Sequence, residues 1–163
     1  MNIAICPGSF DPITLGHLDI IQRASLMFDK VYVAVLVNPS KNPSFTAKER
    51  MDMIKKAVSG IPNVEVECFD GLLADYARLR FAHTIVKGLR AVTDFEYEFQ
   101  LALINRKLNP EIDTVFLTSG AQHMYLSSSF VKSIAQFGGD ISDFVPECIC
   151  REISERLSRR DEK

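Results

Sequence analysis

The sequence predicts one α/β domain built on a five-stranded parallel sheet, and three observations lead to this fold class. Short strand-like apolar runs alternate with segments of helical periodicity along the whole chain. No Asn-Gly pair, a strong hairpin signal, separates the strand-like runs, which favours crossover connections and parallel pairing. The length of 163 residues is that of one ordinary domain. We therefore expect a single doubly wound, Rossmann-like domain over residues 1–163 with helices at its C-terminal end, residues 158–163 being a frayed tail.

Five apolar runs predict the strands. They cover residues 2–6, 30–37, 64–69, 84–87 and 113–118. The first run is expected to stop at Pro7-Gly8, because proline cannot donate to a strand ladder. The second is almost wholly apolar and rich in valine, which is typical of a strand buried on both faces.

Segments with apolar residues at helical spacing predict six helices. They cover residues 15–28, 46–58, 72–80, 93–108, 127–137 and 146–157. Thr46 and Glu49 have the spacing of a capping box, which marks the start of the second helix. Gly138-Gly139 predicts the turn that separates the last two helices.

The long helix over 93–108 carries two sets of apolar residues. One stripe is expected to face the core and consists of Phe95, Phe99 and Leu103. The flanking positions are expected to form an exposed apolar patch and consist of Leu101, Ile104 and Leu108.

Composition excludes several classes of protein. Hydrophobic residues make up 47% and charged residues 25%, which is too much apolar surface for a disordered chain. The longest apolar run, residues 31–37, is about a third of what a bilayer requires. The net charge of −2 indicates no global attraction to nucleic acid, so any anion site must be a local cluster. Residues 1–8 lack a basic segment followed by an apolar one, so secretion is not expected.

The cysteines predict neither a metal site nor disulfides. Cys6 and Cys68 lie in strand-like runs, where a reduced cysteine usually acts as a small hydrophobe. Cys148 and Cys150 form no C-x-x-C pair, and no histidine has ligand spacing to them. This cysteine usage predicts a reducing, cytoplasmic location.

Residues that suit a phosphate site follow the first predicted strand. Gly8 and Gly16 would let a ligand approach the backbone, and Ser9 adds a hydroxyl. Gly16 and His17 open a helix whose N–H groups and dipole favour anions. The segment matches neither the P-loop pattern nor the dinucleotide-binding glycine pattern.

Cations and serines follow the other strands. Lys41 lies in the loop after the second strand, and Lys87 and Arg90 follow the fourth. Cations are disfavoured at a helix N-terminus, so the fourth-strand pair favours an anionic ligand. Ser127, Ser128 and Ser129 open a helix and would add hydroxyl and N–H donors. With no nucleophile paired to a base, the set predicts phosphoryl or nucleotidyl transfer by positioning and electrostatics.

Three motifs resemble those of one family. The segment Pro7-Gly-Ser-Phe-Asp-Pro-Ile-Thr-Leu-Gly-His17 is similar to the T/H-x-G-H motif of the nucleotidyltransferase superfamily. The block Lys87-Gly-Leu-Arg-Ala-Val-Thr-Asp-Phe-Glu-Tyr-Glu-Phe-Gln100 and the segment Ser127-Ser-Ser-Phe-Val-Lys132 narrow the resemblance to bacterial phosphopantetheine adenylyltransferases. It extends from Ile3 to about Leu157.

The resemblance implies an activity and an assembly. AMP would pass from ATP to 4′-phosphopantetheine by direct in-line attack without a covalent intermediate, giving dephospho-coenzyme A and pyrophosphate with Mg²⁺. It also implies a homohexamer and feedback inhibition by coenzyme A. No carboxylate cluster is evident in the sequence, so Mg²⁺ is expected to be held by phosphates and water.

The resemblance also implies roles for individual residues. His17 would stabilise the transition state at the α-phosphate. The residues implied in ATP binding are Ser9, Phe10, His17, Gly88, Leu89, Arg90, Glu98, His123, Met124, Tyr125, Leu126, Ser127, Ser128 and Ser129. Those implied in phosphopantetheine binding are Ser9, Lys41, Leu73, Lys87 and Asn105. Lys87 stands where many relatives have arginine, and the stretch 122–126 departs from the usual pattern.

Two other interpretations are open at this point. One is a sister nucleotidyltransferase that acts on nicotinate mononucleotide or glycerol phosphate, which would not be expected to carry Asp94-Phe-Glu-Tyr-Glu98 after Gly-Leu-Arg90. The other is a catalytically silent nucleotide-binding module, which the presence of both His17 and Arg90 disfavours.

Overall fold

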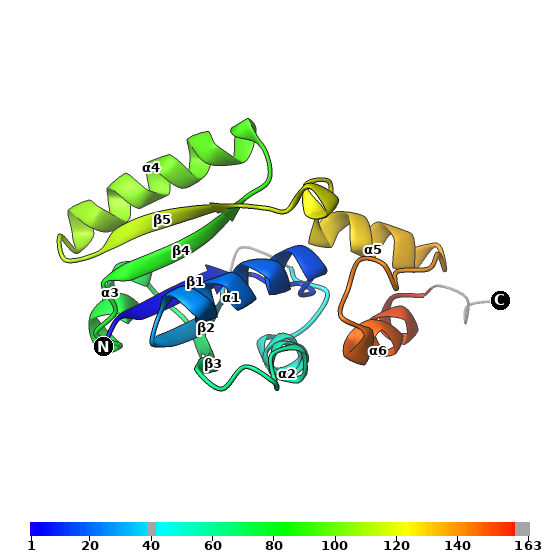
Figure 1. The fold of residues 1–163 in the computed structure, drawn as a ribbon. Coiled ribbons are helices and arrows are strands. Elements are labelled where there is room, and N and C mark those ends of the chain that lie inside the picture. Colours follow the sequence, from blue (N-terminus) through cyan, green and yellow to red (C-terminus); the bar gives the residue numbers. More distant parts are fainter. Residues whose placement is uncertain (39–41, 159–163) are drawn as a thin grey trace.

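The computed structural model describes residues 1–38 and 42–158, and this part of the chain forms one parallel five-stranded sheet (Figure 1). The strand order is β3–β2–β1–β4–β5. The strands are β1 (Ile3–Gly8), β2 (Lys30–Leu36), β3 (Val64–Phe69), β4 (Thr84–Leu89) and β5 (Asp113–Thr118). The predicted fold class and parallel pairing are therefore confirmed.

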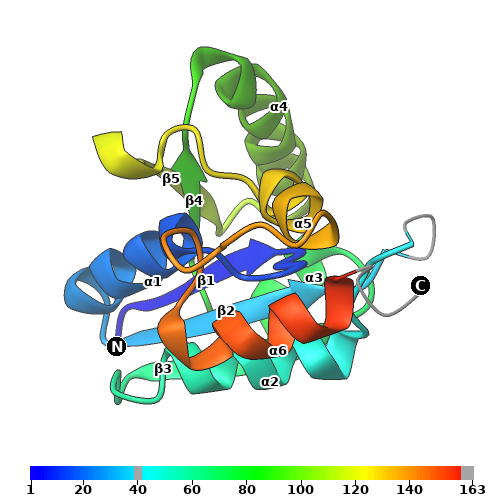
Figure 2. The same ribbon diagram turned by 90° about the vertical axis from the view of Figure 1, so that its right-hand side faces the viewer.

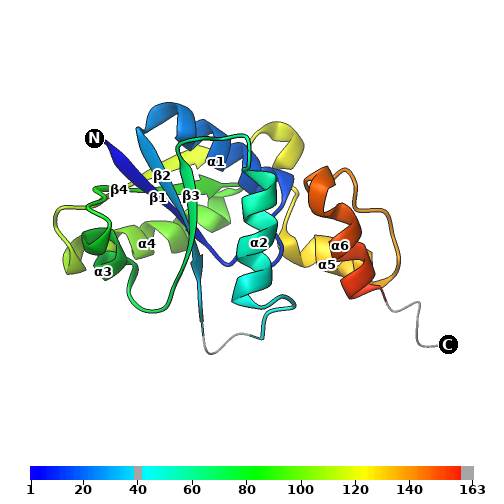
Figure 3. The same ribbon diagram turned by 90° about the horizontal axis from the view of Figure 1, so that it is seen from below.

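Helices connect the strands and cover both faces of the sheet. The α-helices are α1 (Leu15–Met27), α2 (Ala47–Ala57), α3 (Leu73–Leu79), α4 (Val92–Leu108), α5 (Ser128–Gln136) and α6 (Glu147–Leu157). Thr46 and Glu49 form the predicted capping box at the start of α2. A 3₁₀ turn, η1 (Ala121–His123), follows β5 and was not predicted. Figures 2 and 3 show α2 and α6 side by side, with α5 next to α6.

The sheet separates two apolar cores. One lies between the sheet and α1, α2, α5 and α6, where alternate residues of β2 (Val31, Val33 and Val35) point toward these helices. The smaller core lies under α3, where Ala34 and Ile5 meet Tyr76. Because β2 contributes to both cores, its near-continuous apolar sequence is explained.

Two strands run further than expected. β1 continues through Pro7 and Gly8, which pair with Ala34 and Val35 of β2. Since β4 pairs with β1 only at Ala4 and Ile5, β1 has an open side beyond Ile5, where proline is tolerated. β4 continues through Leu89, so Lys87 and Gly88 lie within the strand, opposite Phe116 and Leu117 of β5. The prediction that the strand ends at Lys87 was wrong because pairing with β5 extends it.

One burial prediction was also wrong, and burial of the cysteines likewise depends on the sheet's edges. Phe95, Phe99 and Leu103 of α4 are 40%, 45% and 54% exposed, not part of the core. Phe95 contacts Phe116 of β5, but β5 is the outermost strand, so no further strand covers this helix face. Cys68 is exposed because β3 is the opposite edge, whereas Cys6 on central β1 is buried.

The strand order places a reversal between β1 and β4. The chain winds from β1 outward to β3, then crosses back to β4 and winds outward to β5. Open α/β sheets bind ligands at such a reversal, beyond the carboxyl ends of the strands. In the described part of the chain no helix has the length and apolarity needed to cross a membrane.

Candidate active site

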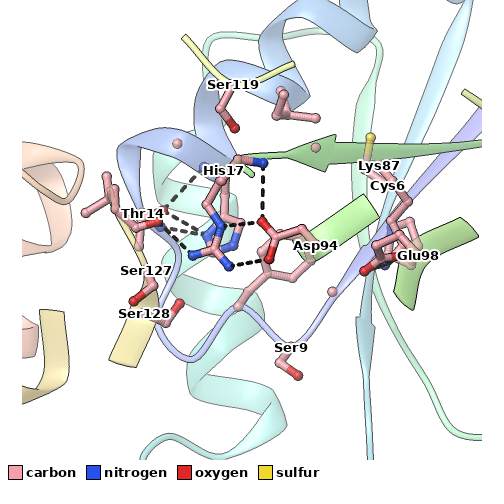
Figure 4. A pocket seen from close by; sticks show the side chains of 18 of the residues that line it. Cys6, Ser9, Thr14, His17, Lys87, Asp94, Glu98, Ser119, Ser127 and Ser128 are labelled. Carbon is pink, nitrogen blue, oxygen red and sulfur yellow. Dashed lines mark hydrogen bonds and ion pairs between the residues drawn. The ribbon is translucent and has the colours of Figure 1, made fainter. Parts of the chain in front are cut away.

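A pocket of about 610 Å³ lies at this reversal (Figure 4). Its walls come from the ends of β1 and β4, the first turns of α1 and α4, and the segment from Ser119 to Ser129. In Figure 4, Lys87 and Glu98 lie toward one end, with Ser127 and Ser128 toward the other. The N-termini of α1 and α5 both open onto this pocket, so their dipoles favour an anion there.

His17 is held by the residue that caps its own helix. Thr14 is the N-cap of α1, and its hydroxyl oxygen accepts from the His17 N–H at 3.3 Å. In return, the main-chain N–H of Thr14 donates to Nδ1 of His17 at 3.1 Å. This is a capping box with histidine in the place usually taken by Glu or Gln.

The protonation state of His17 follows from this bond. Since Nδ1 accepts a hydrogen bond, the proton of the neutral ring must be on Nε2. Burial, with the nearby charges of Arg90 and Lys87, lowers the pKa of His17 to about 4. At neutral pH the ring is therefore an uncharged Nε2–H donor at the pocket wall.

The two cations of the pocket are paired with carboxylates of α4. Lys87 Nζ lies 3.2 Å from Oε2 of Glu98. Arg90 donates through Nε to Asp94 at 3.2 Å, and through Nη1 to the carbonyl oxygen of Leu126 at 3.1 Å. By sequence alone, cations beside a helix N-terminus favour an anionic ligand. Asp94 and Glu98 already neutralise these two cations, so this reason to expect an anion is weakened.

Serines and buried groups complete the pocket. The Ser127 hydroxyl accepts from the Phe130 N–H and caps α5, as predicted. The Ser128 hydroxyl donates to the carbonyl oxygen of Pro12, which ties α5 to the loop after β1. Burial raises the pKa of Cys6 to about 12, so this pocket thiol is protonated and not a nucleophile.

The structure brings together most of the predicted site residues. Those that line the pocket are Ser9, Phe10, His17, Lys87, Gly88, Arg90, Glu98, His123, Leu126, Ser127, Ser128 and Ser129. Those that do not line it are Leu73, Leu89, Asn105, Met124 and Tyr125. Leu73 packs in the smaller core, and Tyr125 lines a separate apolar depression beside α5. Lys41 lies outside the described residues. The ligand contacts of all these residues stay predictions.

Several pocket residues were not singled out from the sequence as site residues. They include Thr14, Asp94, Tyr97, Leu101 and Ser119. The T-x-x-H spacing of Thr14 and His17 was a usable signal, because it is that of a capping box. For Ser119, its place directly after β5 was the signal.

The pocket does not contain a protein-built metal site. Within the described residues, no three His, Cys, Asp or Glu side chains gather so as to hold a metal ion. Asp94 and Glu98 are paired with Arg90 and Lys87, which opposes a cation beside them.

The fold and the anion-favouring pocket are those of α/β nucleotidyltransferases. Comparisons with known proteins agree with this class. The sequence profile of the Cytidylyltransferase-like family matches residues 5–134. A putative nicotinate-nucleotide adenylyltransferase from Vibrio parahaemolyticus has a similar structure, with a TM-score of 0.66 at 24% identity, covering 97% of this chain and 99% of that one. At that identity the likeness shows the fold alone.

Curated relatives identify the family within this class. The phosphopantetheine adenylyltransferase of Caldanaerobacter subterraneus subsp. tengcongensis is 54% identical over 159 residues, covering 98% of this chain and 99% of that protein. That of Alkaliphilus metalliredigens is 56% identical over 156 residues, covering 96% and 99%. The chain belongs to the phosphopantetheine adenylyltransferase family, and it is a nucleotidyltransferase enzyme.

Proposed function

We propose that this enzyme transfers AMP from ATP to 4′-phosphopantetheine, forming dephospho-coenzyme A and pyrophosphate. The observation that carries the proposal is the capped His17, a neutral ring protonated on Nε2 that lines a pocket together with Lys87 and Arg90. An acceptor phosphate is already ionised at neutral pH, so it can attack without a general base. The catalytic demand is then to bind phosphates and stabilise charge at the α-phosphorus.

The residues divide this work by their chemistry. His17 donates from Nε2 to a non-bridging oxygen of the α-phosphate, where negative charge grows in the transition state. Arg90 and the N-termini of α1 and α5 bind the phosphates of ATP. Lys87 binds the phosphate of the acceptor, and its three N–H donors allow it to keep Glu98 as a partner. Attack is in line and direct, with Mg²⁺ entering as part of the MgATP substrate.

The Lys87–Glu98 pair also supports discrimination between ligands. Glu98 Oε2 is buried and lacks a hydrogen-bond partner among the described residues, although Lys87 faces it. An anionic group next to Glu98 is repelled unless Lys87 lies between them. A neutral donor, such as a hydroxyl or an amine of a nucleoside, would satisfy Oε2. This arrangement supports binding of ATP by Glu98 through a neutral group, while Lys87 takes the acceptor's phosphate.

Assembly and regulation belong to the same proposal. We expect a homohexamer in which α4 contributes to an interface between copies, because this helix exposes contiguous apolar residues beside edge strand β5. We also expect coenzyme A to compete for the acceptor site, since it contains the phosphopantetheine group. The enzyme is proposed to act in the cytoplasm, which fits the free thiols of its four cysteines.

The test is release of pyrophosphate from MgATP with each of three acceptors: 4′-phosphopantetheine, nicotinate mononucleotide and glycerol phosphate. We expect release with 4′-phosphopantetheine alone, and a product with the mass of dephospho-coenzyme A. A preference for either other acceptor would identify a sister enzyme. ATP binding without release in any mixture would identify a non-catalytic nucleotide-binding module.

A further inference from the structure

The segment that leads from β1 to His17 passes through a strained residue. Phe10 has φ = 49°, a left-handed conformation that side chains rarely adopt and that costs about 1–3 kcal/mol. Such a residue persists only where its surroundings hold it. The residues on both sides of Phe10, Ser9 and Asp11, are held by side chains of α2 and α5. These contacts indicate how the strained conformation is maintained.

After Phe10, Asp11 anchors the segment to two other parts of the chain. Its carboxylate accepts from the N–H groups of Ser44 and Phe45 at 3.0 and 2.9 Å, and from Lys132 of α5 at 2.8 Å. These bonds satisfy the buried carboxylate and account for its burial. Asp11 therefore has a structural role, which is to fix the segment after Phe10.

Before Phe10, Arg50 of α2 holds the chain at Ser9. It is 4% exposed, and its Nη1 donates to the carbonyl oxygen of Ser9 at 2.6 Å and to that of Leu36 at 3.4 Å. No ion pair to Arg50 is found within the described residues, and there its Nε is buried without a hydrogen-bond partner. An unsatisfied buried donor costs about 1–3 kcal/mol, so stability alone does not explain this arginine.

The ring of Phe10 shows where the hold on Ser9 is transmitted. It folds back over Gly8, where a Cβ would lie only 3.0 Å from the ring atoms. It packs against the His17 ring in a T-shaped arrangement, with centroids 5.2 Å apart and planes at 73°. The path therefore runs from Arg50 through the Ser9 carbonyl and the Phe10 backbone to one side of His17, while Thr14 holds the other.

We propose that Arg50 is a positioning residue for the reaction: by holding the Ser9 carbonyl it keeps Phe10 in its left-handed conformation and so aims the ring of His17 at the reacting phosphate. Arg50 acts through Ser9 and Phe10. The inference rests on the proposed function, in which His17 contacts the α-phosphate.

The test compares Arg50→Met and Arg50→Lys with two matched controls on α2. Lys48→Met removes an exposed charge from the same helix, and Ile54→Val loosens its buried face. Arg50→Met is expected to lower kcat about tenfold to a hundredfold, with each KM within about twofold of wild type. Arg50→Lys retains one donor for Ser9 and should recover part of the loss. Neither control should change kcat by more than about twofold.

A second measurement does not depend on activity. In protein labelled with ¹⁵N-histidine, Arg50→Met is expected to shift the ring-nitrogen signals of His17, assigned with His17→Gln, whereas Lys48→Met should leave them in place. An absence of AMP transfer in wild type would contradict the proposed function, and the His17 signals would still test this inference. If Arg50→Met does not fold, Arg50→Gln decides, because the shorter glutamine amide ends near the position of Nε and cannot take the place of Nη1 at the Ser9 carbonyl. A glutamine variant with wild-type kcat and unshifted His17 signals overturns the proposal. Lower thermal stability with unchanged kcat per folded molecule overturns it equally.

Discussion

Thr14 and His17 cap the first turn of α1 reciprocally, and the bond from the Thr14 N–H to His17 Nδ1 determines which ring nitrogen carries the proton. A capping box normally uses a carboxylate or an amide at the third helical position. Histidine at that position satisfies the same N–H and leaves Nε2 free to donate. The capping box that starts α1 thus also fixes the tautomer of the proposed catalytic residue.

The first prediction concerns the ionisation of His17. Because burial and two nearby cations lower its pKa to about 4, its ¹⁵N signals should report a neutral Nε2–H ring from pH 8 down to pH 5. The unfolded chain takes up this proton near pH 6.5 and the folded protein only near pH 4. Stability should therefore fall as pH drops from 6.5 toward 4, and less so in His17→Gln. A ring that titrates above pH 6 would contradict the assignment.

A second prediction separates binding from chemistry at the same residue. His17→Ala should lower turnover by roughly a hundredfold or more, as expected for the loss of a donor to developing charge. The affinity for ATP, measured by calorimetry, should change far less. If ATP binding and turnover fall equally, His17 only holds the ground state.

The third prediction assigns Lys87 of β4 and Arg90 of the following turn to different substrates. Lys87→Ala should raise KM for 4′-phosphopantetheine with little change for ATP, and Arg90→Ala should do the reverse. Each lost charge-assisted hydrogen bond is worth about 1.5–3 kcal/mol, or roughly ten- to a hundredfold in affinity. Lys87→Arg keeps the charge opposite Glu98 and should restore most of the affinity. Matched effects of the two alanine variants on both substrates would rule out this division.

A fourth prediction tests the close packing of α1 on β4. A Cβ at Gly88 would lie 2.8 Å from Cγ1 of Ile20, a stiff β-branched side chain. Gly88→Ala should therefore destabilise the protein by about 1–3 kcal/mol in urea unfolding. Gly60→Ala is the control, because nothing lies within 4 Å of a Cβ there. Adding Ile20→Ala to Gly88→Ala should cost less than the sum of the single changes, and strict additivity would contradict the steric explanation.

The fifth prediction concerns assembly through α4. Ile104 is 53% exposed on this helix, and if the proposed hexamer forms through it, Ile104→Asp should convert the assembly into smaller species in light scattering. Leu26→Asp is the control, because Leu26 is 87% exposed and belongs to α1, not to the proposed interface helix. Wild-type protein with the mass of a monomer at micromolar concentration would overturn the proposed assembly.

Much of the fold and part of the site could be predicted because their signals are local. The capping box of Thr46 and Glu49, the N-cap of Ser127 and the valine-rich β2 are properties of neighbouring residues, and the structure confirms them. The burial of the Phe95 stripe could not be predicted correctly, because it depends on β5 being the outermost strand. Arg50 gave no functional signal, since 41 positions separate it from Ser9 and a helical arginine usually faces solvent.

The sequence by itself determined the alternation of strands and helices, the residue types at the strand ends and the family. Tertiary structure alone decided that β1 and β4 are neighbours and that their carboxyl ends both line the pocket, because strand order depends on pairing between distant segments. It likewise decided that Asp94 and Glu98 neutralise the two cations, that Thr14 sets the tautomer of His17, and that Arg50 supports Ser9. Distances and burial determine these electrostatic relationships, and both arise only when the chain is folded.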